Sequence, residues 1–157
     1  MIAPTENCPW RKKILCGEVH DDNAYAMGGV AGHAGVFSSA RDVHTFLLRM
    51  SRCFYGSDDF LPQALVQEFF KKNDSDGNAN FALGWDTPSS ERSASGHMFS
   101  SHSVGHLGFT GCSIWWDLEK NCHIILLTNR VHPTRKNEKI KDFRPLIHDE
   151  IMRALFP

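Results

Sequence analysis

The sequence has no long apolar run, and the longest, Ile124 to Leu127, is much too short to cross a bilayer. It also has no excess of one charge, because 17 basic and 18 acidic residues leave a formal net charge of -1. A balanced chain has no overall field to attract nucleic acid or an acidic membrane surface, so neither is an expected partner. No apolar export segment follows Met1, so the chain as written is not expected to be exported.

Paired cysteines are missing as well. The five cysteines are an odd number, and none stands in a C-x2-C pair. The closest approaches to metal-ligand spacing are Cys8-x7-Cys16-x3-His20 and His102-x3-His106, whereas structural zinc sites are built from closely paired ligands. The sequence therefore favours reduced thiols, and it predicts neither a metal nor a cofactor.

The first half of the chain contains clustered glycines and then apolar residues at helical spacing. The first 37 residues are predicted to be irregular, and residues 28–35, GGVAGHAG, read as a tight loop with few side chains. Ser39 and Asp42 form a capping box ahead of an amphipathic helix over 40–53. A second helix is expected over 62–72, and the polar stretch 71–80 is expected to form a loop.

The second half reads as a sheet followed by a helix. Strands are predicted over 81–86, 103–116 and 122–129, joined by turns short enough for antiparallel pairing. The four consecutive apolar residues of the last strand predict burial on both faces and a central place in the sheet. A final helix is expected over 143–155. This order predicts an α+β fold in one domain over 1–157, with a loop and helical part over 1–80 and a sheet plus helix over 81–157.

The most informative segment is 103–111, SVGHLGFTG, in which glycines leave one backbone edge bare next to His106. It is similar to the third active-site box of the serine β-lactamases and penicillin-recognising hydrolases, where Lys or His, then Ser or Thr, then Gly opens a sheet strand. Three further pieces resemble the same family in the same order: residues 28–50, ALGW at 82–85 and LTNRVHP at 127–133. The chain therefore resembles the C-terminal portion of class C β-lactamases and related serine esterases.

Two features depart from the resembled family. Its nucleophile lies in a Ser-x-x-Lys box and its general base in a Tyr-x-Asn-like box, and these 157 residues contain neither. In addition, Leu107 stands where Ser or Thr is common, so the hydroxyl that would contact a substrate carboxylate is missing. The resemblance thus implies acyl transfer on a small amide or ester substrate, by an enzyme whose N-terminal half is not in this sequence. The chain alone is expected to be inactive.

The resemblance also implies roles for the box residues. The backbone N–H of Phe109, just after Gly108, would be the second oxyanion-hole donor, and two fixed donors stabilise a tetrahedral intermediate. His106 would donate to the substrate or tune the base. Leu107, Thr110 and Gly111 would border the substrate.

Other interpretations of the sequence stay open. The chain is alternatively a non-catalytic truncated product that acts as an interaction module, or a small metal-binding domain. A Ser-His-Asp triad of Ser103, His106 and Asp86 is a weaker hypothesis, because no G-x-S-x-G turn exposes a serine. The resembled family is often periplasmic or secreted, so no compartment is assigned.

Overall fold

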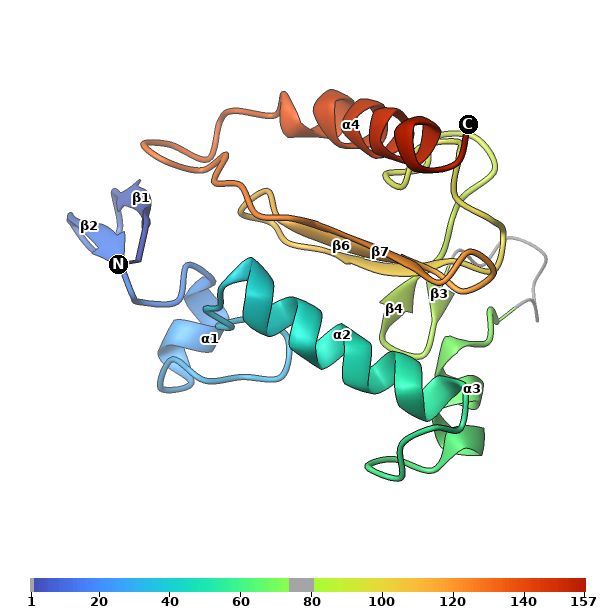
Figure 1. Cartoon of the computed structure of the whole chain (residues 1–157). Coiled ribbons are helices and arrows are strands. Elements are labelled where there is room, and N and C mark those ends of the chain that lie inside the picture. The colour runs from blue at the N-terminus through green and yellow to red at the C-terminus, as the bar shows by residue number, and fades with distance from the viewer. Residues whose placement is uncertain (1, 74–80) are drawn as a thin grey trace.

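A computed structural model describes residues 2–73 and 81–157 of the chain. Its main sheet has five strands in the order β3-β4-β5-β6-β7, and every neighbouring pair is antiparallel. Helix α4 (Ile140–Leu155) covers one face of this sheet, while α2 (Ala40–Phe54) and α3 (Gln63–Phe70) lie on the other (Figure 1). The expected α+β architecture is confirmed. The strands are β3 (Phe81–Ala82), β4 (Trp85–Asp86), β5 (Val104–Leu107), β6 (Ser113–Asp117) and β7 (Cys122–Leu126).

The single strand predicted over 103–116 is wrong, because the chain folds back on itself in the middle of that stretch. The Gly111 N–H donates to the Gly108 carbonyl at 2.9 Å and closes a turn between β5 and β6. Gly111 has φ +116°, a conformation that side chains with a Cβ rarely adopt. Two of the glycines that suggested a bare strand edge, Gly108 and Gly111, thus close a hairpin turn.

The strand predicted over 81–86 is wrong for the same reason. It is a small hairpin, in which Phe81 pairs with Asp86 and Ala82 pairs with Trp85. Gly84, at φ +77°, makes the reversal. In both segments a glycine with positive φ divides an apolar stretch into two short strands, and the apolar pattern alone does not show this division.

Strand β7 lies at the edge of the five-stranded sheet and not at its centre, so that prediction is also wrong. It ends at Leu126, earlier than the predicted 129. Only Ile124 is buried in this strand, and its neighbours Ile125 and Leu126 are half-buried. A run of four apolar residues therefore does not require cover on both faces here.

The three predicted helices are present, with changed ends. Helix α2 begins after Ser39, whose Oγ accepts the Asp42 N–H at 3.2 Å, so the capping box is confirmed. Helix α3 is shorter than the predicted 62–72, and α4 begins at Ile140 and not at 143. Phe143 already donates its N–H to the Lys139 carbonyl, so one helical turn precedes Pro145. The predicted loop over 71–80 lies largely outside the described residues, since 74–80 are not described.

The first 37 residues are more regular than predicted. Strands β1 (Pro4–Cys8) and β2 (Lys13–Cys16) form a two-stranded antiparallel hairpin. Helix α1 (Asp22–Ala26) follows, capped by Asp21, whose Oδ1 accepts the Ala24 N–H at 2.7 Å. The hairpin is tied to the C-terminal half, because the Asn7 N–H donates to the Pro133 carbonyl at 3.0 Å.

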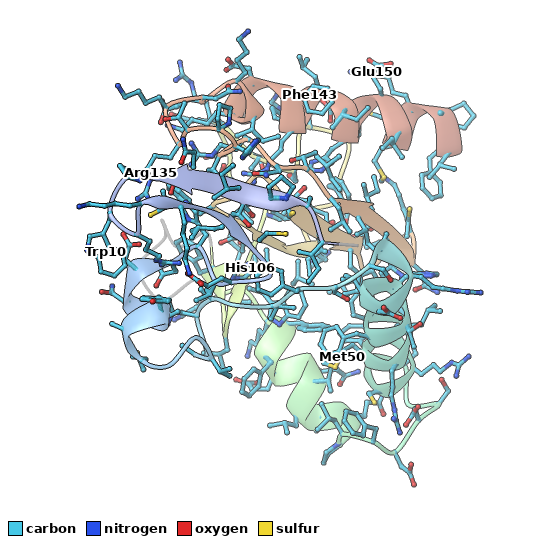
Figure 2. All side chains as sticks on the ribbon, turned by 90° about the vertical axis from the view of Figure 1, so that its left-hand side faces the viewer. Trp10, Met50, His106, Arg135, Phe143 and Glu150 are labelled. Atoms are coloured by element: carbon cyan, nitrogen blue, oxygen red, sulfur yellow. The ribbon has the colours of Figure 1, made fainter. Side chains whose placement is uncertain are left out.

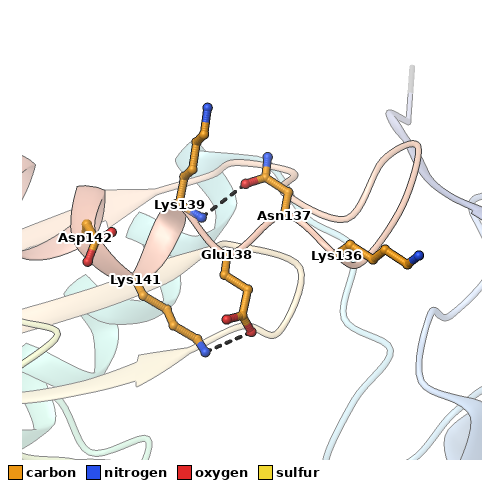
Figure 3. A pocket seen from close by; sticks show the side chains of 6 residues that line it. All are labelled: Lys136, Asn137, Glu138, Lys139, Lys141 and Asp142. Atoms are coloured by element: carbon orange, nitrogen blue, oxygen red, sulfur yellow. Dashed lines mark hydrogen bonds and ion pairs between the residues drawn. The ribbon is translucent and has the colours of Figure 1, made fainter.

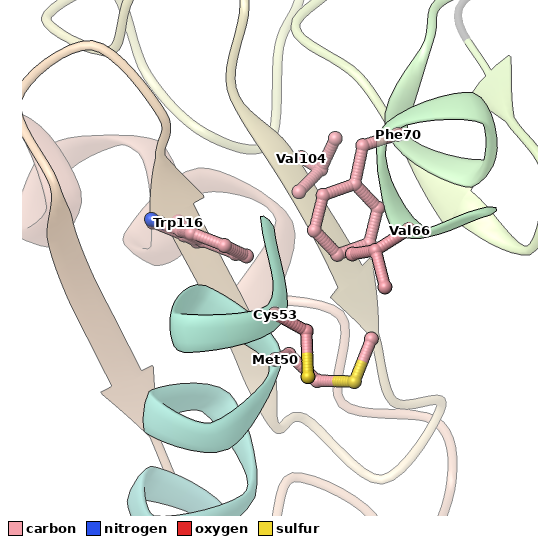
Figure 4. Packing of buried hydrophobic residues seen from close by; sticks show 6 residues of the cluster. All are labelled: Met50, Cys53, Val66, Phe70, Val104 and Trp116. Carbon is pink, nitrogen blue, oxygen red and sulfur yellow. The ribbon is translucent and has the colours of Figure 1, made fainter. Parts of the chain in front are cut away.

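The core has one apolar cluster on each face of the sheet. Trp116 packs with α2 and α3 (Figure 4), and Trp115 packs toward α4. These two side chains therefore point to opposite faces of the sheet. The first cluster contains Met50, Cys53, Val66, Phe70, Val104 and Trp116, and the second contains Phe99, Trp115, Ile124 and Met152.

Candidate functional site

The His-x-Gly segment occupies the end of β5 and the turn that follows it. His106 lies opposite Ile114 of β6, and its side chain is exposed. Figure 2 shows His106 at the end of the molecule that carries the N-terminal hairpin and the start of α2. Leu107 points the other way, since it packs against the apolar cluster under α4. The two neighbouring residues therefore face opposite sides of the sheet.

Every carbonyl in the turn between β5 and β6 accepts a hydrogen bond. The guanidinium of Arg144, from α4, donates to the carbonyls of Gly108 (2.7 Å), Gly111 (3.2 Å) and Cys112 (2.8 Å). Arg130, which follows β7, donates from Nε to the Phe109 carbonyl at 2.8 Å and from its backbone N–H to the Thr110 carbonyl at 2.8 Å. Two arginines from different elements thus hold one five-residue turn.

The N–H groups of the same turn divide into two kinds. Gly108 donates to the Cys112 carbonyl at 2.8 Å and Gly111 donates to Gly108, so both serve the turn itself. Within the part of the chain that the structure describes, the Phe109 and Thr110 N–H groups have no acceptor. These two donors are available to a ligand.

The Phe109 side chain is 59% exposed, but it has two neighbours. The Arg130 guanidinium lies 4.2 Å from its ring centroid, and the His20 ring stacks on it at 5.5 Å. His20 in turn lies 3.0 Å from the buried carboxylate of Glu6, which also accepts two hydrogen bonds from Arg135 at 2.8 Å each. The N-terminal hairpin and the 129–135 segment therefore meet beside the turn.

Asp86 pairs with Gly105 across β4 and β5, next to the box. Burial raises the pKa of the Asp86 carboxyl, while the positive charges of His106 and Arg144 and the Leu107 N–H oppose that rise. Burial also lowers the pKa of Arg144, but a guanidinium remains charged at neutral pH. Asp86 is thus an electrostatic neighbour of the box and not a partner in a triad.

The structure does not bring a serine to His106. Ser103 is fully buried, and its Oγ lies 3.2 Å from Ser100 Oγ. In the described ranges 2–73 and 81–157, no hydrogen bond joins Ser103 to His106. A second serine–histidine pair, Ser113 Oγ and His148 Nε2 at 3.1 Å, is buried under α4, and its His148 Nδ1 faces the Ala94 carbonyl in place of a carboxylate. Neither pair offers a nucleophile that substrate can reach.

A hollow in the surface lies at the start of α4 (Figure 3). It has a volume of about 750 Å³, and the Lys141–Glu138 ion pair at 2.9 Å lies on its wall. Its lining is Lys136, Asn137, Glu138, Lys139, Lys141 and Asp142. Exposed, mutually paired charges of this kind are typical of a solvated helix approach.

Among the described residues there is no group of three or more His, Cys, Asp or Glu side chains that could hold a metal ion. None of the helices in these residues is long and apolar enough to span a membrane.

The comparison with known families decides the assignment. The sequence profile of the family described as "Beta-lactamase" matches residues 4–148. The chain belongs to the β-lactamase family. The family predicted from the His-x-Gly box and its companion segments is therefore confirmed.

Relatives in this family are much longer than the chain. It is 34% identical over 134 residues to proteins from Salmonella agona and Salmonella gallinarum, each named "Putative D-alanyl-D-alanine carboxypeptidase". The match covers 83% of this chain but 31% of each relative. A crystal structure of a β-lactamase from Mycobacterium bovis is similar with a TM-score of 0.62, at 19% identity, over 77% of this chain and 46% of that one. At this identity the likeness concerns the fold.

Sequence reasoning missed the two arginines that hold the turn. For Arg144 the sequence holds one indication, since Arg144, His148 and Met152 are spaced four residues apart and so lie on one face of a helix. The structure shows that all three residues are buried. A charged residue within a buried stripe indicates a specific partner. For Arg130 no such signal existed, since its acceptor Phe109 lies 21 residues away in a different hairpin.

Proposed function

We propose that this chain forms the oxyanion and substrate-binding wall of a serine acyl-transfer site. The nucleophile and the general base would come from a polypeptide segment outside these 157 residues. The observation that supports this proposal is the unpaired Phe109 N–H, one residue after Gly108 in a β-lactamase-family chain. A preorganised N–H stabilises the developing oxyanion, since it needs no reorientation when the charge appears.

The other box residues take roles that follow from their placement. His106, exposed on β5, is free to donate to the substrate or to influence the proton balance of an incoming base. Thr110 and Gly111 border the substrate from the turn. Leu107 contributes its backbone only, because its side chain packs toward α4.

The proposed substrate is a peptide amide bond, and an ester is the second candidate. The Salmonella relatives are named as carboxypeptidases, which supports peptide hydrolysis. Leu107 lacks the hydroxyl that would contact a substrate carboxylate, which disfavours recognition through a carboxylate and keeps an ester as the second candidate.

The completing segment would also cover apolar surface. Met27, Val30 and Val36 flank or lie within the glycine-rich loop and are 68%, 87% and 90% exposed. Several exposed apolar side chains in and beside one loop favour an interaction surface. An interaction module without catalysis would use the same surface, so activity must distinguish the two functions.

The test is reconstitution. The purified chain alone is expected to hydrolyse neither nitrocefin, p-nitrophenyl acetate nor diacetyl-L-lysyl-D-alanyl-D-alanine above buffer. Co-expressed with the part of the Salmonella agona relative that this chain does not match, it is expected to release D-alanine from the peptide. Turnover by the chain alone that a serine-reactive phosphonate blocks would contradict the proposal, as would a stable complex without hydrolysis.

A matched pair of variants tests the Phe109 N–H. Phe109→Pro removes the donor, and proline suits the second position of a turn closed between Gly108 and Gly111. We expect kcat of the reconstituted pair to fall by about 100- to 1000-fold. Phe109→Ala keeps the N–H and is expected to retain kcat within about threefold, since it removes no transition-state hydrogen bond. Equal effects of the two variants would contradict the role of the N–H.

A further inference from the structure

We infer that Arg144 and Arg130 are positioning residues that hold the β5–β6 turn as a binding site for a small anion. The anion would be a carboxylate-like oxygen bound by the Phe109 and Thr110 N–H groups. The catalytic meaning of this site rests on the proposed function, whereas anion binding itself does not.

Arg144 supplies the buried half of this arrangement. Arg144 is 7% exposed, and its guanidinium donates to the carbonyls of Gly108, Gly111 and Cys112. In the part of the chain that the structure describes, no carboxylate lies within ion-pair distance of Arg144. Arg144 keeps its positive charge behind the turn, and the Asp86 carboxylate, which lies beyond ion-pair distance, offsets part of it.

Arg130 supplies the outer half. Its guanidinium donates to the Phe109 carbonyl at 2.8 Å and also to the carbonyls of Arg135 (2.8 Å) and Asn137 (3.0 Å). The last two bonds anchor the side chain to the loop before α4. Arg130 is thus rigidly held where it fixes the peptide plane that carries the Phe109 carbonyl.

Together the two arginines fix the peptide planes of the turn through its carbonyls. All five carbonyls from Gly108 to Cys112 are engaged by the protein, and two N–H groups are used inside the turn. The N–H groups of the consecutive residues Phe109 and Thr110 have no acceptor among the described residues, and the guanidinium groups of Arg130 and Arg144 lie close to the same turn. Successive free N–H groups in a turn form a concavity that binds anions, and the fixed positive charges strengthen it.

Lysine could not replace Arg144 in this role. A planar guanidinium donates in several directions at once, as the three carbonyl contacts require, whereas an ammonium is a compact point charge. Gly111 completes the fit, because a Cβ there would lie 2.6 Å from Thr128 Oγ1 and 3.2 Å from the Arg130 N atom. The turn is therefore shaped closely around its two arginines.

The test uses the full 157-residue chain, labelled with 15N, in an acetate titration at constant ionic strength. We expect saturable shifts of the Phe109 and Thr110 amide signals. In Arg144→Met and in Arg130→Met the apparent Kd for acetate should weaken by about tenfold or more, because charge-assisted hydrogen bonds fix the donors. Arg144→Lys should fall between wild type and Arg144→Met. The matched control is Arg153→Met, an exposed arginine on the same helix.

The outcomes separate this inference from the proposed function. Should Arg144→Met not fold, as judged by the Trp115 and Trp116 indole signals, the half-exposed Arg130→Met carries the test. Acetate shifts that are absent in wild type, or unchanged in a folded Arg144→Met and in Arg130→Met, would overturn the inference. Shifts that depend on both arginines, in a chain that reconstitutes no hydrolysis, would support the anion site and contradict the proposed function.

Discussion

The ring of Trp115 occupies the space that a side chain at Gly105 would need. A Cβ built on Gly105 would lie 2.4 Å from Trp115 Cδ2 and 2.7 Å from the Ile114 carbonyl oxygen. The two residues are also paired across β5 and β6. The missing side chain at this position therefore accommodates the indole ring, and the bare backbone of Gly105 faces the core and not a ligand.

Gly105→Ala is expected to destabilise the fold by about 3 kcal/mol, the upper end of the cost of overpacking. The added methyl meets a buried ring and a strand carbonyl, and neither is the flexible end of a side chain. Urea unfolding followed by tryptophan fluorescence measures the change. Gly32→Ala is the control, since a Cβ there has nothing within 4 Å, and it should change stability by less than about 0.5 kcal/mol. Equal costs at both positions would refute the packing role of Gly105.

The helices were predictable because their signals are local. Ser39 and the apolar period behind it lie within one segment, and the structure places α2 almost as predicted. The hairpins were less predictable, since a turn such as that at Gly111 depends on φ, and the sequence does not reveal it before the strands are paired. Strand β1 carried no apolar alternation, and its Glu6 is buried only because Arg135, 129 residues away, neutralises it.

The residues of the candidate site could be proposed from the sequence only in part, and their roles stay predictions. His106, Gly108 and Phe109 could be named from a local motif, and the family match supports the motif. The contacts that shape the turn could not be named, because Arg130 and Arg144 reach it from two other elements. Long-range hydrogen bonds of this kind leave no periodic trace in a sequence.

Ser39→Ala is expected to cost about 1 kcal/mol of stability, the usual contribution of a helix N-cap. The Ser39 hydroxyl accepts the Asp42 N–H and donates to the Asp42 carboxylate at 2.8 Å, so both interactions are lost. Thermal unfolding followed by circular dichroism measures the loss. Ser38→Ala, whose hydroxyl bonds only the neighbouring Ser39 carbonyl, should be close to neutral. A larger effect at Ser38 than at Ser39 would contradict the capping assignment.

Acid should destabilise the chain through His123. Burial and the nearby His44 lower the pKa of His123 from 6.5 to about 4, and its Nε2 is buried without a partner among the described residues. Between these two values the unfolded chain binds a proton that the folded chain does not. Stability therefore falls as the pH drops from about 6.5 to about 4, by up to about 3 kcal/mol.

The variant that tests this is His123→Phe, which keeps a ring against Trp116 and removes the titration. Unfolding free energies at pH 7 and pH 5 should differ less in His123→Phe than in wild type. Some acid sensitivity should remain, because burial also lowers the pKa of His148. The control His97→Phe, at an exposed position, should keep the wild-type difference. An unchanged pH dependence in His123→Phe would rule His123 out as its source.

Glu6→Gln is expected to loosen the N-terminal hairpin from the rest of the fold. The Glu6 carboxylate is 1% exposed and meets both Arg135 and His20, and the Arg135 hydrogen bonds hold the pKa of Glu6 below its usual value. A carboxyl with a lowered pKa stabilises the fold above its unfolded pKa, and this contribution is lost as the pH falls through the folded value. We expect a cost of about 2 kcal/mol at pH 7 that shrinks in acid, less than for a fully buried pair because Arg135 is partly exposed.

The same variant should reach the turn, because His20 joins Glu6 to Phe109 by a stacked contact at 5.5 Å. In Glu6→Gln the Phe109 amide signal should shift while the Trp116 indole signal, on the far side of the sheet from α4, stays in place. Glu119→Gln removes an exposed carboxylate paired with His102 and should move neither signal. If the free energy of unfolding falls but the Phe109 amide signal does not shift, the hairpin contributes to stability only. If both change together, the N-terminal hairpin helps to position the oxyanion donor.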